Sequence, residues 1–142
     1  MECVFCKIIN KEIPADILYE DKYVIVFLDI NPISKGHSLI VPKKHFESLE
    51  DVDDKYLKKI ITRIKKVSSI LIKAVNKEGF NLLLNNKKAA GQFIDHLHFH
   101  IIPRSLGDNV NLENSKYIYN ENEKKEIIKN FKYFKRSKKD LK

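Results

Sequence analysis

The fold is decided by one stretch of the chain, His96-Leu97-His98-Phe99-His100-Ile101-Ile102. Side chains at alternate positions of a β-strand share a face, so this pattern predicts a strand with three imidazoles in a row, roughly 6–7 Å apart. The apolar residues between them suit packing against a helix. For a single histidine, a half-exposed strand with a chance polar residue would be the better explanation, but these are three of the five histidines in the chain. Because imidazole ligates metals, transfers protons and acts as a nucleophile near neutral pH, the row is interpreted as functional.

The segments before this stretch alternate in the manner of further strands. The predicted strands are residues 17–20, 23–29, 38–41, 81–85 and 97–102, and the first two form a hairpin that turns at residues 21–22. Strands lie on both sides of one long helical segment, and the connections are short. The chain is therefore expected to be an α+β protein with a mainly antiparallel five-stranded sheet.

Three helices are expected beside the sheet. A short one ends before Pro14, a long one is capped by Asp53 and ended by Gly79, and a closing one runs from residue 120 or 121 to residue 134. The long helix has apolar residues at the i, i+3, i+4, i+7 spacing of a buried face, namely Leu57, Ile60, Ile61, Ile64, Val67, Leu71 and Val75. This face is expected to cover the sheet.

Length and composition limit the classes of protein. The 142 residues suffice for one domain, and a hydrophobic content of 43% excludes a wholly disordered chain. We expect residues 1–120 to form the domain, and residues 121–142 to form a helix and basic tail that pack on it or extend from it. Of the net charge of +8, residues 121–142 carry +5. A polyanionic partner is possible on charge alone, as nucleotide, nucleic acid or acidic membrane.

Targeting signals are not seen in the sequence. No apolar run approaches the 18 or more residues of a membrane span. The first residues, Met1 to Cys6, have no basic region followed by an apolar stretch, so a secretory signal is not expected. These observations predict a cytoplasmic protein without a membrane partner.

Cys3 and Cys6 form a C-x-x-C pair, which has three interpretations: half of a zinc site, a redox pair, or two buried thiols. A redox pair normally follows a strand and opens a helix, and no strand precedes Cys3. A zinc site needs four ligands, so two more would have to come from elsewhere in the chain, with histidine as the natural source.

Two further features lie near the histidine strand or at a strand end. The segment from Ala89 to Gln92 contains small residues and Gly91, which allow a ligand to approach the backbone, and a turn here would direct amide groups at a phosphate. Any loop can contain glycine, so this signal is weak by itself. Asp29 ends an apolar strand and is either a strand cap or a contact to a ligand such as a vicinal diol.

These motifs together resemble the histidine triad superfamily, and in particular its nucleotide-binding branch. The resemblance rests on the triad followed by Pro103-Arg104, and on the upstream segments Phe5–Ile9, Glu12–Ala15, Phe27–Pro32 and Gly36–His45. It extends from about residue 3 to residue 104 and contains several motifs in the family's order. Residues 105–142 lie outside it.

The resemblance implies a catalytic mechanism for the triad His96, His98 and His100. His98 would attack the α-phosphorus of a nucleotide, and water would then hydrolyse the covalent nucleotidyl-histidine. The second ring nitrogen of His98 would donate to a backbone carbonyl. His100 and the backbone amides of residues 92–94 would donate to phosphate oxygens.

The resemblance also implies a nucleotide pocket and a metal site. Asp29 would bind the ribose hydroxyls, Phe27 and Ile30 would face the base, and His37 would line the pocket. The complete nucleotide-binding set would be Phe27, Asp29, Ile30, Asn85, Gly91, Gln92, Phe93, Ile94 and His100. A structural zinc ion would be held by Cys3, Cys6, His45 and His96.

The implied activity is hydrolysis of a purine nucleoside phosphoramidate or related adenylate by a homodimeric enzyme. Two alternatives stay open: a dinucleoside polyphosphate hydrolase, and a nucleotide-binding scaffold with negligible turnover. Many relatives have a hydrogen-bonding side chain where this chain has Phe93, which leaves the preferred leaving group open. Nucleic-acid binding through the basic tail ranks lowest, because no base-stacking or groove-reading motif accompanies its lysines.

Overall fold

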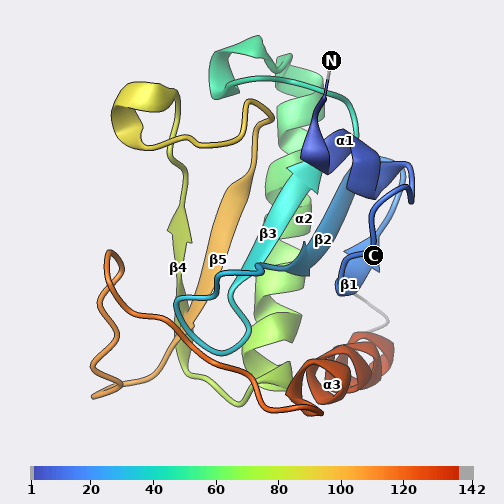
Figure 1. Cartoon of the computed structure of the whole chain (residues 1–142). Coiled ribbons are helices and arrows are strands. Elements are labelled where there is room, and N and C mark those ends of the chain that lie inside the picture. The colour runs from blue at the N-terminus through green and yellow to red at the C-terminus, as the bar shows by residue number, and fades with distance from the viewer. Residues whose placement is uncertain (1, 138–142) are drawn as a thin grey trace.

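The computed structural model describes residues 2–137, and these residues form one antiparallel sheet with helices on both of its faces (Figure 1). The five strands, in spatial order, are β1 (Ile17–Glu20), β2 (Val24–Leu28), β3 (Ser38–Pro42), β5 (Phe99–Arg104) and β4 (Gly79–Leu83). The three α-helices are α1 (Val4–Ile9), α2 (Asp54–Ala74) and α3 (Glu123–Ser137). The predicted α+β class with a five-stranded antiparallel sheet is confirmed.

Helix α2 begins as the sequence predicts and ends earlier. The Asp53 carboxylate accepts a hydrogen bond from the Tyr56 amide at 3.1 Å, which caps the first turn. The helix ends at Ala74, and Asn76 follows with a φ of 55°, a left-handed conformation that terminates helical hydrogen bonding. The prediction that Gly79 ends this helix is therefore wrong, since Gly79 opens β4.

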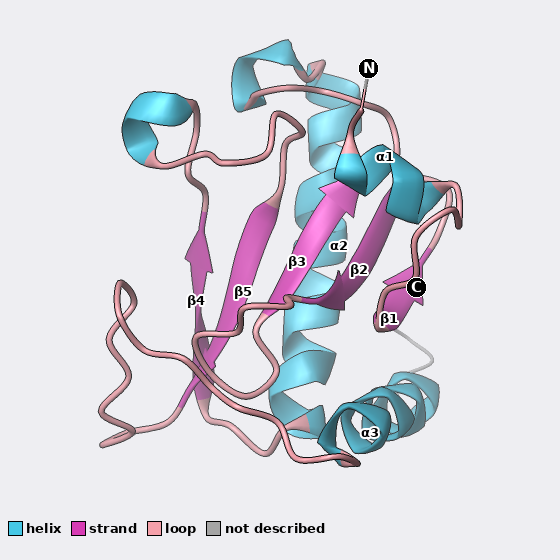
Figure 2. Ribbon diagram, viewed as in Figure 1, coloured by secondary structure: helices cyan, strands magenta, loops and turns pink. Residues whose placement is uncertain are grey.

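The two faces of the sheet bury different parts of the chain. Helix α2 lies behind the sheet in Figure 2. Its buried residues Ile60, Ile64 and Val67 belong to one core cluster with Leu97 and Ile101. Helix α1 crosses in front. On that face a smaller cluster forms from Phe5, Ile8, Ile25, Phe27, Leu39 and Val41. The front face is the face that carries the histidines.

Helix α3 is packed on the same core as the rest of the chain. Its residues Ile127 and Phe131 are 1% and 0% exposed, and they join the cluster behind the sheet, beneath α2 and β1. The helix runs from residue 123 to 137, later at both ends than the sequence predicts. The last five residues of the predicted basic tail, 138–142, lie outside the described residues. Within residues 2–137, no helix is both long and apolar enough to cross a membrane.

The histidine strand begins and ends two residues later than the sequence predicts. Strand pairing begins at Phe99, so His96 and His98 precede β5 and only His100 lies within it. Before that point the chain bends, and Leu97 donates to the Phe46 carbonyl oxygen at 2.7 Å in place of a ladder of strand bonds. The rings of His98 and His100 are closer than predicted, with centroids 5.2 Å apart.

Candidate functional site

His98 is held in one tautomer by its own backbone. Its Nδ1 lies 2.8 Å from the carbonyl oxygen of His96. A carbonyl can only accept, so Nδ1 carries the proton and donates, and the lone pair of the neutral ring is on Nε2. Burial lowers the pKa of His98, which keeps the ring neutral near pH 7. A neutral imidazole with a free Nε2 lone pair has the form required of a nucleophile.

The ring of Phe5 supports the triad from α1. Its centroid lies 5.1 Å from the His98 ring and 5.8 Å from the His96 ring, both edge-to-face. Sequence reasoning did not assign Phe5 to the site. The available signal was its position three residues before Ile8, which places both on the buried face of a short helix.

His37 and His100 are joined by a hydrogen bond. The Ile33 amide donates to Nδ1 of His37 at 2.9 Å, so the proton of the neutral His37 ring is on Nε2. That Nε2 lies 2.9 Å from Nδ1 of His100 and donates to it. Nδ1 of His100 is therefore an acceptor, and the proton of His100 is on its Nε2. The Ile33 amide and the His37 ring thus determine which nitrogen of His100 can donate to a substrate.

Burial favours the neutral form of both rings in this pair. It lowers the pKa of His37 to about 4 and, with repulsion from His37 and His98, that of His100 to about 4. Asp29 approaches the pair, with Oδ2 at 3.4 Å from Nε2 of His37 and 3.9 Å from Nδ1 of His100. Its other oxygen accepts from the Asn31 amide at 2.8 Å. Asp29 thus caps the end of the strand and also places a carboxylate beside the histidines. The two interpretations of Asp29, as a strand cap and as a ligand contact, are therefore compatible.

The residues predicted to face the base lie in different environments. Phe27 is buried at 4% exposure and packs edge-to-face on Phe5, with centroids 5.7 Å apart. Ile30 follows the end of β2 and is 84% exposed. Phe27 thus belongs to the core cluster under the histidine face of the sheet, whereas the Ile30 side chain faces solvent.

The predicted phosphate loop is a tight turn ahead of the triad. Gly91 has a φ of 93°, the left-handed region in which a side chain is strained, and the Asn85 side chain borders it. Ile94 is half-buried, whereas Phe93 is 95% exposed. The glycine is required by this turn, and the loop presents Phe93 to solvent.

The side chain of Gln92 holds this loop in shape. Its Oε1 accepts from the Lys87 amide at 2.6 Å, and its Nε2 donates to the carbonyl oxygens of Glu47 and Ile94 at 2.7 and 2.9 Å. These bonds use both hydrogens of the amide and tie the two ends of the loop together. Gln92 therefore has a structural role beside the nucleotide contact predicted for it.

The structure brings together the four predicted metal ligands, Cys3, Cys6, His45 and His96, whose ligand atoms all lie within 4.8 Å of one another. Sγ of Cys3 is 3.3 Å from Nδ1 of His96, and Sγ of Cys6 is 3.3 Å from Nδ1 of His45 and 3.6 Å from Nδ1 of His96. A tetrahedron of two sulfurs and two nitrogens around Zn²⁺ has edges of roughly 3.3–3.8 Å. The donor set and its spacing fit this ion.

The surroundings of the cluster also suit a cation. Nε2 of His96 donates to the Pro42 carbonyl oxygen at 2.9 Å, which orients the ring and leaves Nδ1 facing the sulfurs. Burial and the neighbouring Cys3 raise the pKa of the Cys6 thiol to about 11, so thiolates at this place require a nearby positive charge. Both cysteines are free of disulfide bonds.

Comparison with known proteins gives relatives for most of the chain. An adenosine 5'-monophosphoramidase from Schizosaccharomyces pombe is 44% identical over 104 residues, which are 73% of this chain and 75% of the relative. An adenylylsulfatase from Arabidopsis thaliana is 47% identical over 107 residues, 75% of this chain and 54% of the relative, so the chain spans about half the length of that protein.

A solved structure has a similar fold over nearly the whole chain. The zinc-bound histidine triad family protein from Mycobacterium smegmatis superposes with a TM-score of 0.81 at 28% identity, over 96% of this chain and 98% of that one. A family model described as the HIT domain matches residues 10–106, which include β1 to β5, the phosphate loop and the triad. The chain belongs to the HIT family.

Proposed function

We propose that the protein is a nucleotidyl hydrolase that cleaves purine nucleoside phosphoramidates, in the nucleotide-binding branch of the HIT family. The observation that carries the proposal is the bond from Nδ1 of His98 to the His96 carbonyl, which leaves a nucleophilic Nε2. The relatives named as an adenosine 5'-monophosphoramidase and an adenylylsulfatase support a hydrolase that attacks an adenylyl group.

In the first step, the Nε2 lone pair of His98 forms a bond to the α-phosphorus, and the bond from phosphorus to the leaving amine breaks. The amine takes up a proton from water. His100, protonated on Nε2, donates a hydrogen bond to a phosphate oxygen as negative charge develops there. In the second step, water attacks phosphorus, the P–N bond to His98 breaks, and the nucleoside monophosphate leaves with His98 restored.

The substrate is recognised at two ends. The Asp29 carboxylate accepts hydrogen bonds from the ribose diol, and Phe27 with Ile30 bounds the base. The phosphate lies against the loop around Gly91, where amide groups of residues 92–94 face it. Phe93 offers no side-chain hydrogen bond to a leaving group.

The test is turnover of adenosine 5'-phosphoramidate by wild type and by His98→Asn. Removal of the nucleophile should reduce kcat by roughly 10³-fold or more, and the wild type alone should carry a phosphoramidate-bonded adenylyl group in a quenched sample. Equal rates for the two proteins would remove His98 as the nucleophile. A higher kcat/KM on diadenosine polyphosphates would move the assignment to that substrate class, and tight binding of adenosine 5'-monophosphate without turnover would indicate a scaffold.

We propose that the Cys/His cluster holds a structural zinc ion. The tetrahedral spacing of the ligands and the orientation of His96 by Pro42 support this, and four protein ligands leave no open position for a substrate. The ion would tie the start of α1 to the residue that begins the triad. Its expected effect is therefore on stability and on the placement of His98.

We propose that the protein is a homodimer formed through β4 and the first half of α2. β4 lies at one edge of the sheet, and its residues Phe80 and Leu82 are 38% and 43% exposed. Leu82 pairs with Ile101, which packs under α2, so these side chains lie on the α2 side of the sheet. Ile61 of α2 is 48% exposed on that same side.

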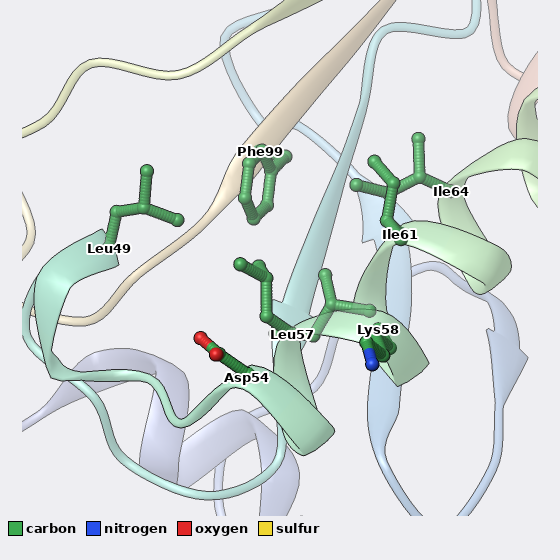
Figure 3. A pocket seen from close by; sticks show the side chains of 8 residues that line it. Leu49, Asp54, Leu57, Lys58, Ile61, Ile64 and Phe99 are labelled. Carbon is green, nitrogen blue, oxygen red and sulfur yellow. The ribbon is translucent and has the colours of Figure 1, made fainter.

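A hollow of about 350 Å³ deepens this apolar surface. Figure 3 shows Leu49, Leu57 and Phe99 directed toward it, with Asp54 and Lys58 near its edge. A second copy related by a twofold axis would pair β4 with β4 and cover the hollow, which removes the free sheet edge. Sedimentation should give a dimer for wild type and a monomer for Ile61→Asp, with Tyr133→Ser, an exposed site on α3, as the control that stays dimeric.

A further inference from the structure

The segment that follows β5, residues 105–122, lies beyond the matched family region from residue 107 onward and contains neither a helix nor a strand. It nevertheless runs beside the loop that follows β2, as the orange coil in Figure 1 shows. The Tyr117 amide donates to the Pro32 carbonyl oxygen at 2.8 Å, and the Gly36 amide donates to the Tyr119 hydroxyl at 2.9 Å. The segment is thus bound to the loop at two points, Pro32 and Gly36.

The attachment continues into α3. Lys35 of the loop lies 3.5 Å from the Glu123 carboxylate, and the Tyr117 hydroxyl donates to the same carboxylate. This loop is the one that begins with Asp29 and ends with His37, both of which lie at the histidine site. A segment that lies mostly outside the family model is therefore placed against the ribose side of the proposed nucleotide pocket.

Between the loop and the segment is a hollow of about 490 Å³, which is within the size range of small-ligand sites. Ile30 from the loop and Ile118 from the segment both line it, and they are 84% and 87% exposed. Two isoleucines that face water at one hollow form an apolar surface of the kind that marks a binding site. Ile30 directly follows Asp29 in the chain, so one wall of the hollow is formed by the neighbour of the residue proposed to bind the ribose.

We infer that Ile118 completes the base subsite, so that the purine base lies between Ile118 of the post-triad segment and Ile30 of the loop. This inference rests on the proposed function, because Asp29 and Ile30 orient the nucleotide toward the hollow. The apolar side chains contact the faces of the base and desolvate it. Specificity for the base is then set by a segment that the HIT domain itself does not contain.

The experiment compares two substrates that differ only at the base. One is adenosine 5'-phosphoramidate, and the other is the 5-phosphoramidate of methyl riboside, which has a methoxy group in place of the base. Ile118→Ala should raise KM for the adenosine substrate roughly 5- to 20-fold with kcat unchanged, and should leave both constants for the methyl riboside unchanged. Leu106→Ala, which truncates another aliphatic side chain of the same segment at 91% exposure, should change neither substrate.

Each other outcome has a defined meaning. An unchanged KM for adenosine phosphoramidate in Ile118→Ala overturns the inference. An equal rise in KM for both substrates also overturns it, because Ile118 would then act by positioning the loop. If wild type cleaves neither substrate, the proposed function fails, and calorimetric titration with adenosine 5'-monophosphate then decides the inference alone: weaker binding by Ile118→Ala supports it, and equal binding overturns it.

Discussion

Nε2 of His37 lies 2.9 Å from Nδ1 of His100, and His37 is 2% exposed. The Ile33 amide fixes the proton of His37 on Nε2, and this proton in turn makes Nδ1 of His100 an acceptor. These hydrogen bonds run from a backbone amide to His37 and then to His100, and they leave Nε2 of His100 as the nitrogen proposed to donate to a phosphate oxygen. In that proposal His37 acts on the substrate only through His100, so it is a positioning residue.

The first prediction concerns the hydrogen bond from His37 to His100. His37→Leu removes the donor to His100 and frees its tautomer, so kcat for adenosine 5'-phosphoramidate should fall roughly 10- to 100-fold with KM changed less than about threefold. His37→Gln retains an N–H donor of similar reach and should recover part of the loss. Steady-state kinetics on both variants, with circular dichroism to verify folding, measure this. Equal losses in the two variants would mean that His37 serves only to fill space.

The second prediction concerns stability and pH. The pKa of both His37 and His100 is lowered to about 4 from an ordinary value of 6.5, so between these values the unfolded chain binds more protons than the folded one. The free energy of unfolding should therefore be level above pH 6.5 and decrease as the pH falls toward 5. Each proton taken up on unfolding contributes a slope of about 1.4 kcal/mol per pH unit.

Urea unfolding at pH 7.5, 6.5, 6 and 5.5 measures this slope. In His100→Gln one of the two groups is absent, so the slope between pH 6.5 and 5.5 should be shallower while the plateau at higher pH remains. A slope identical to that of wild type would show that His100 is not neutral by burial in the folded protein.

The fold was predictable because its signals are local. The apolar spacing between Leu57 and Leu71 predicts α2, and Asp53 predicts its start, because helix periodicity and capping depend on residues a few positions apart. The end of the helix was missed, because Asn76 takes a left-handed conformation three residues before Gly79, the glycine predicted to end the helix. The start of β5 was missed for a tertiary reason, since Leu97 bonds to Phe46, which is 51 positions earlier in the chain.

The sequence predicted which residues gather at the site, but it did not predict what each of them contacts. Cys3, Cys6, His45 and His96 meet as the family resemblance implies. The partners of Gln92 could not be predicted, because its bond to the Glu47 carbonyl exists only once two loops distant in sequence have been brought together, and its bond to the Lys87 amide depends on how its own loop folds. Ile118 gave no signal, since an isolated isoleucine in a polar loop is common and only the hollow beside Ile30 gives it a meaning.

The third prediction concerns the proposed zinc ion. Wild-type protein should contain one zinc per chain, and a strong chelator should lower Tm by roughly 10 °C, because a ligand present at 100 times its Kd contributes about 2.7 kcal/mol. Cys6→Ser should show the lower Tm without chelator and should not respond to it. Glu2→Gln, a neighbour of the cluster that carries no ligand atom in it, should behave as wild type. Metal analysis that finds no zinc, with no response of Tm to chelator, would contradict the site.

The last prediction concerns whether α3 belongs to the same cooperative unit as the sheet. Phe131 is fully buried beneath α2 and β1, so Phe131→Ala should lower the free energy of unfolding by roughly 3–5 kcal/mol, through lost apolar burial and the cavity left behind. Tyr133→Ala, two residues away on the same helix and 64% exposed, should change it by less than about 0.5 kcal/mol. Urea unfolding followed by far-ultraviolet circular dichroism and by tyrosine fluorescence should give one coincident transition for wild type and for both variants. A separate early transition in Phe131→Ala would mean that α3 unfolds on its own, and the loop that carries Asp29 and His37 would then lose its attachment through Glu123 before the sheet unfolds.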